Sequence, residues 1–100
     1  MIEPESVELY RQEGAEFRSV RLTVSRDGEV KMESQDMGKT VQEFWGSDEY
    51  EYGVLVAANQ LPKLVFALLR DRYAGRCGAV DEFTELCKKE GIEHGWDSWP

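Results

Sequence analysis

Apolar and polar residues alternate through the first third of the chain, which predicts β-strands. The alternation runs over 7–11 and again over 17–25, so each stretch has one apolar and one polar face. Asp27-Gly28 comes next and favours a two-residue type I′ hairpin turn, because glycine tolerates the positive φ that this turn needs. A return strand that begins at 30–32 then completes the hairpin.

The spacing of apolar residues changes in the second half of the chain. Residues 38–45 have apolar side chains three and four apart, as on a short helix, whereas 49–58 favours a strand. The apolar end of that strand predicts a central position in the sheet. Asn59 is expected to cap a first long helix that ends at Gly75, and a second helix is expected over 79–90.

The order of the predicted elements indicates an α+β fold. Strands joined by hairpins come first and the two long helices are grouped after them, with 92–99 as a short last strand or an extended tail. We therefore expect one domain over residues 1–100. It has an antiparallel sheet of about four to five strands, with two main helices packed on one face.

The charge balance is acidic and limits the class of partner. The chain carries 20 Asp and Glu against 12 Lys and Arg, a net charge of −8, and no base lies between Lys39 and Lys63. Nucleic-acid phosphates require a basic surface, so the composition argues against a nucleic-acid partner. It favours either plain solubility or a basic protein partner.

No segment of the sequence predicts insertion into a membrane. The longest apolar run, residues 64–69, is far shorter than the roughly 20 residues that span a bilayer, and the first residues are acidic and lack a signal-peptide core. The expected location is therefore the cytoplasm, with no membrane partner.

The chain also lacks the residue patterns that common catalytic sites need. Gly38-Lys39-Thr40 resembles the end of a phosphate-binding loop, but Glu33 stands where that loop has its first glycine. One histidine, His94, is present, and no pattern places the thiol of Cys77 or Cys87 beside it. We expect Cys87 in the core, Cys77 in a loop, and neither catalytic residues, nor a cofactor, nor a metal site.

Aromatic and acidic side chains are concentrated around 43–52, where no base balances them. On a strand, Tyr50 and Tyr52 share one face while Glu49 and Glu51 share the other. Aromatic residues anchor protein interfaces, and neighbouring acids select a basic partner. The residues predicted to bind the partner are Glu43, Trp45, Asp48, Glu49, Tyr50, Glu51 and Tyr52.

Two other functions follow from the same residues. Asp48, Glu49 and Glu51 are carboxylates of the kind that a metal-dependent enzyme uses. Alternatively, the aromatic segment pairs with itself in a structural homo-oligomer, because edge strands and apolar patches favour self-association.

Five segments between Asp36 and Trp99, about two-thirds of the chain, follow one another in a recognisable order. They are Asp36-Met37-Gly38, Val41–Gly46, Asp48–Tyr52, a Leu-rich helix ending in RDRYAG, and the closing GIEHGWDSW. In this order the chain resembles a group of small acidic bacterial proteins that are similar to immunity proteins of polymorphic toxin systems. The resemblance implies an inhibitor that binds and neutralises the C-terminal domain of a secreted toxin.

Overall fold

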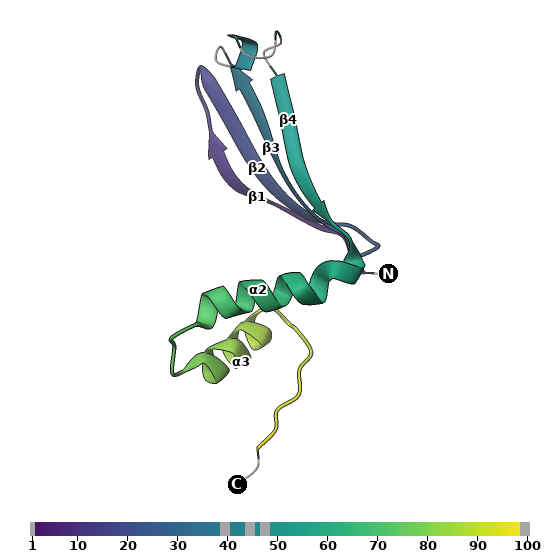
Figure 1. Cartoon of the computed structure of the whole chain (residues 1–100), viewed down its shortest axis with the longest axis vertical. Helices are drawn as coiled ribbons and strands as arrows, with labels where there is room; N and C mark the ends of the chain where they lie inside the picture. The colour runs from purple at the N-terminus through teal and green to yellow at the C-terminus, as the bar shows by residue number, and fades with distance from the viewer. Residues whose placement is uncertain (1, 39–40, 44–45, 47–48, 99–100) are drawn as a thin grey trace. The chain divides into compact units, whose positions relative to one another are not determined.

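A computed structural model describes residues 2–38, 41–43, 46 and 49–98. Its strands are β1 (Glu5–Gln12), β2 (Glu16–Val24), β3 (Val30–Gly38) and β4 (Glu49–Val56), and its helices are the short 3₁₀-helix η1 (Ala58–Gln60), α2 (Leu61–Tyr73) and α3 (Ala79–Lys89) (Figure 1). The chain divides into two compact units, Met1–Lys63 and Leu64–Pro100. The first unit holds the sheet, and the second holds α3 and most of α2.

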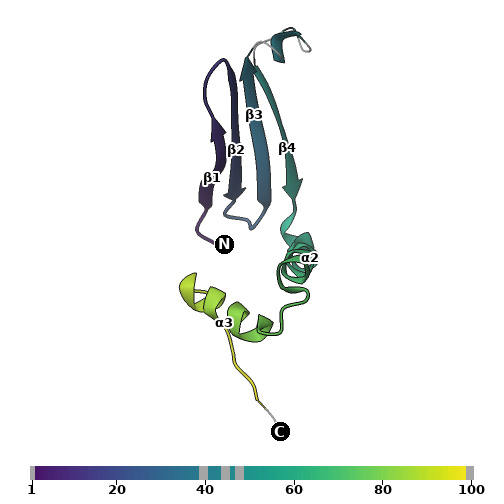
Figure 2. The same cartoon turned by 90° about the vertical axis from the view of Figure 1, so that its left-hand side faces the viewer.

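The four strands form one antiparallel sheet in the order β1-β2-β3-β4, and Figure 2 shows them side by side in that order. The predicted α+β class, the antiparallel sheet and the two main helices are confirmed. A single domain, and helices packed on one sheet face, stay predictions. The central position expected for the strand over 49–58 is wrong, because β4 is the last strand of the described sheet. The apolar end of this strand suggested a central, buried position, but Val54 and Leu55 are both largely exposed.

The strand register separates the sheet into an apolar and a polar face. Residues that pair across strands share a face, and the side chains of each strand alternate between the two faces. The apolar face carries Val7, Tyr10, Val20, Leu22, Val24, Val30, Met32, Tyr52, Val54 and Val56. The polar face carries Ser6, Glu8, Arg11, Ser19, Arg21, Thr23, Lys31, Glu33, Gln35, Glu49 and Glu51.

The hairpin between β2 and β3 is present, but its turn is not the predicted two-residue type I′. The Ser25 N–H donates to the Glu29 carbonyl at 2.9 Å, so the loop between them has three residues. The Gly28 N–H donates back to the Ser25 carbonyl, and Gly28 has a φ of 82°. This is the longer loop in which one left-handed residue follows a type I turn. Asp27 keeps a negative φ, whereas type I′ needs positive values at both central residues.

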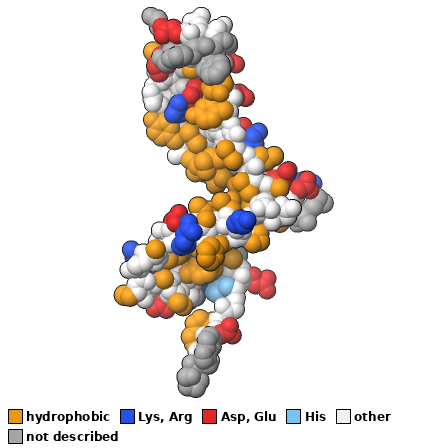
Figure 3. Space-filling model, viewed as in Figure 1, with side chains coloured by type: hydrophobic (Ala, Val, Ile, Leu, Met, Phe, Trp, Pro, Cys, Tyr) orange, Lys and Arg blue, Asp and Glu red, His pale blue; other side chains and the backbone are white. Residues whose placement is uncertain are grey.

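The apolar face is largely exposed. Val54 is 67% exposed, and Val7, Tyr10, Met32 and Tyr52 are each about half exposed. Figure 3 shows hydrophobic side chains on the surface over the strands. Single exposed apolar residues are ordinary, whereas a group of them on one face is less common in a monomeric protein.

A glycine with a positive φ follows the C-terminal end of each long helix, Gly75 after α2 and Gly91 after α3. Gly75 follows α2 with a φ of 79°, as predicted. After α3, the Ile92 N–H donates to the Cys87 carbonyl at 2.8 Å and the Gly91 N–H to the Lys88 carbonyl at 3.3 Å, which is the Schellman pattern. Cys87 is 5% exposed, as expected of a core thiol.

One detail predicted for the second half is wrong, and one alternative left open there is decided. Asn59 lies inside η1, so it does not cap α2, which begins at Leu61. Residues 92–98 form no strand and follow the extended alternative. No helix in the described part of the chain is both long and apolar enough to span a bilayer.

We predict that Gly53→Ala destabilises the sheet. A Cβ at Gly53 would lie 2.9 Å from both the Glu33 Cβ and the Met32 carbonyl oxygen, so β4 would have to move away from β3. Overpacking of this kind costs about 1–3 kcal/mol of unfolding free energy. This loss of unfolding free energy is measured by urea denaturation that is monitored by circular dichroism. Gly95→Ala is the control, because nothing lies within 4 Å of a Cβ there, and equal stability of the two variants would contradict the prediction.

Candidate functional site

The predicted partner-binding residues centre on the first half of β4. Glu49 and Glu51 are exposed, and Glu43 is exposed in the short helical segment 41–43. Trp45 and Asp48 lie outside the described residues. The described members of the set therefore come from the edge of the sheet and the segment that leads to it.

The strand register places the acids and the tyrosines of β4 on opposite faces, as the alternation predicted. Glu51 pairs with Gln35 of β3 on the polar face, and Tyr52 pairs with Ser34 on the apolar face. A ligand lying on one face would meet only one of the two chemical groups. A ligand at the edge of the sheet would meet both.

The two tyrosines form a stacked pair. The ring centroids of Tyr50 and Tyr52 lie 5.4 Å apart with an angle of 29° between the ring planes. Tyr52 is 47% exposed, whereas Tyr50 is half-buried. Stacking holds the exposed ring in a defined orientation, so Tyr52 presents a rigid aromatic surface beside the outer edge of β4.

A polar cluster of Arg18, Ser34 and Asp36 adjoins this pair, and no pattern in the sequence predicted it. The Arg18 guanidinium donates to both Asp36 carboxylate oxygens, at 2.8 and 2.7 Å. The Ser34 hydroxyl, in a side chain 7% exposed, donates to Asp36 at 3.1 Å. The Arg18 guanidinium holds the pKa of the Asp36 carboxyl below its usual value; partial burial opposes this effect, and the Ser34 hydroxyl adds a smaller lowering. The predicted two-residue turn gave no signal for it, because that turn would pair Arg18 with Met37, whereas the three-residue loop pairs Arg18 with Asp36.

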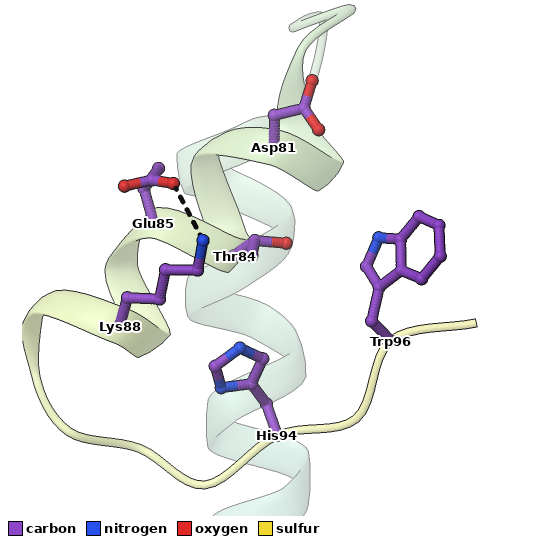
Figure 4. Close-up of a pocket in the computed structure, with 6 residues that line it drawn as sticks. All are labelled: Asp81, Thr84, Glu85, Lys88, His94 and Trp96. Carbon is purple, nitrogen blue, oxygen red and sulfur yellow. Dashed lines mark ion pairs between the residues drawn. The ribbon is translucent and has the colours of Figure 1, made fainter. Parts of the chain in front are cut away.

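A second candidate site is a pocket of about 400 Å³ between α3 and the C-terminal segment (Figure 4). Figure 4 shows His94 and Trp96 on the C-terminal segment, across from the side chains of α3. The pocket is lined by Asp81, Thr84, Glu85, Lys88, His94 and Trp96.

The polar groups of this pocket are mostly engaged with one another or with the backbone. Lys88 Nζ lies 3.7 Å from a Glu85 carboxylate oxygen. The Thr84 hydroxyl donates to the Val80 carbonyl at 2.8 Å. His94 Nδ1 lies 2.7 Å from the Ile92 carbonyl oxygen. The pocket thus offers an indole and a carboxylate rather than a nucleophile with a base.

The thiols and carboxylates of the described chain form no grouped metal-ligand set. Cys77 is exposed in its loop and Cys87 is buried, as predicted. Within the described residues, no three His, Cys, Asp or Glu side chains lie together as metal ligands. The chain matches no protein-family model, no curated protein and no solved structure.

The Arg18–Asp36 pair predicts an acid-sensitive contribution to stability. Because the folded pKa of Asp36 lies below the unfolded value of about 3.9, the contribution is present above about pH 4. This contribution to stability is lost as the pH falls through the pKa that Asp36 has in the folded protein. Asp36→Asn should lower the urea midpoint at pH 7, and the difference from the wild type should shrink below pH 4. The control substitution is Asp97→Asn. If the urea midpoint of Asp36→Asn differed from that of the wild type by the same amount at every pH, the prediction would be contradicted.

We predict that Trp96 contributes fluorescence without contributing stability. Its side chain is 70% exposed, so Trp96→Phe should change the unfolding free energy by less than about 0.5 kcal/mol. The same substitution should remove a component of the emission that acrylamide quenches readily. A quenching curve unchanged by the substitution would show that Trp96 is shielded.

Proposed function

We propose that this protein is a small acidic binding module that masks a basic surface on a partner protein. The observation that carries the proposal is the composition of the β4 region. Exposed carboxylates at Glu49 and Glu51 and an exposed ring at Tyr52 meet at one edge of the sheet. Interfaces commonly combine an aromatic anchor with charges that complement those of the partner.

Long-range attraction supports the same proposal. The net charge of −8 and the absence of any base between Lys39 and Lys63 give this region a negative field. Such a field speeds the encounter with a basic partner and disfavours acidic ones. The proposed role is that of an inhibitor or immunity protein, which the sequence resemblance also favours.

The other polar side chains of the sheet form hydrogen bonds and ion pairs with one another, which argues for binding rather than catalysis at this edge. Arg18, Ser34 and Asp36 satisfy one another, and the polar face holds further internal pairs, such as Arg11 with Glu8 at 3.1 Å and Lys31 with Glu33 at 3.3 Å. Groups that satisfy one another in this way support the sheet and keep its surface polar.

Self-association is the second candidate function, and the exposed apolar face favours it. Val54 and the half-exposed side chains around it would be covered if two copies met through this face. Light scattering across a range of concentrations separates the two candidates. A dimer that persists at low concentration would favour self-association.

We predict that reversing the charge of β4 weakens partner binding. Native lysate is passed over the immobilised chain at low and high salt, and the affinity of a retained basic protein is then measured. Glu49→Lys with Glu51→Lys should lower that affinity at least about tenfold, which corresponds to about 1.4 kcal/mol. The control is Glu3→Lys with Glu93→Lys, which changes the net charge equally but lies outside β4. Equal loss in both double variants, or no loss in either, would overturn the proposed function.

A further inference from the structure

The two edges of the described sheet differ in regularity. In β1 the pairing with β2 shifts between Glu8 and Tyr10, which leaves Leu9 in a bulge. In β4 the pairing with β3 runs without a shift from Glu49 to Val56. Bulges are one of the devices that prevent an edge strand from pairing with another chain. The β1 edge has this protection, and the β4 edge does not.

The sequence of β4 also lacks the proline and lysine that commonly protect an edge strand. Its charges, Glu49 and Glu51, lie in its first half, and its second half, Gly53–Val56, carries no charge. Val54 and Leu55 are 67% and 60% exposed. An edge strand that pairs regularly with its neighbour and has an exposed apolar half is a template for a further strand.

The alternation of β4 defines which strand it would accept. A strand added beside β4 places its own side chains alternately next to Glu51 on the polar face and next to Tyr52 and Val54 on the apolar face. Basic residues complement Glu49 and Glu51, and apolar or β-branched residues complement Tyr52 and Val54. The matching sequence therefore alternates basic and apolar residues beside Glu49–Tyr52, whereas beside Gly53–Val56 the polar face of β4 carries Gly53 and Leu55 and offers no charge.

We infer that β4 binds an extended segment of the partner as a fifth strand of the sheet, with basic side chains toward the polar face and apolar side chains toward the apolar face. This inference rests on the proposed function and specifies how the partner is recognised. Backbone hydrogen bonds along β4 provide affinity, and the alternating side chains provide specificity. The stacked Tyr50–Tyr52 pair borders the same edge and offers a rigid ring to the incoming apolar residues.

The test uses the full chain and eight-residue peptides of defined sequence. A labelled peptide of alternating Lys and Val should bind at least tenfold more tightly than one of alternating Glu and Val, measured by fluorescence anisotropy. Two further Lys-Val peptides carry N-methyl groups, one on the Lys residues and the other on the Val residues. In an extended strand these two sets of N–H groups point to opposite sides, so one methylated peptide should bind and the other should lose at least tenfold in affinity. Equal affinities of the two methylated peptides would overturn the inference.

Amide hydrogen exchange gives a second readout that needs no substitution. The Lys-Val peptide should slow exchange at alternate amides between Glu51 and Val56 and leave the β1 amides unchanged. Protection of β1 instead, or of neither edge, would overturn the inference. So would concentration-dependent protection of β4 without peptide, since a second copy would then occupy the edge. If a basic protein binds in a Glu51-dependent manner while neither readout shows strand addition, the proposed function stands and only its mode is wrong.

Discussion

The organisation of the sheet depends on cross-strand rows of apolar side chains that must face the same way. Val24, Val30 and Val56 form one such row, and Leu22, Met32 and Val54 form the next. A shift of one residue in any strand would turn its apolar side chains to the polar face. The register of all three strands therefore follows from keeping these rows together, and the remaining features of the sheet take their positions from it.

The same constraint explains the turn between β2 and β3. A two-residue turn at Asp27-Gly28 would pair Val24 with Lys31, whereas the three-residue loop pairs Val24 with Val30. Contact between the apolar side chains of these rows outweighs the local preference of a dipeptide for one turn type. The loop register then brings Arg18 opposite Asp36, which produces the ion pair beside the tyrosines.

The position of β4 at the edge gives the acidic segment its functional interest. On a central strand, Glu49, Glu51 and Tyr52 would be separated by the sheet, with one group of side chains on each side. At an edge, a ligand strand would contact side chains of both faces, so the carboxylates and the tyrosine rings would meet the same ligand. The bulge in β1 makes the opposite edge a poorer template, which leaves the sheet with one preferred direction of growth.

Local pattern alone determined the elements: the alternating strands, the helix that stops at Gly75, the helix over 79–90, and the division of β4 into an acidic and a tyrosine side. These depend on periodicity and on glycine conformation, which act over a few residues. Only the tertiary structure decided that β4 lies at an edge, that the hairpin loop has three residues, and that Arg18, Ser34 and Asp36 form one cluster. Each of these depends on which residues far apart in the chain become neighbours. The pairing register is decided by the summed packing of whole strands and not by any single residue.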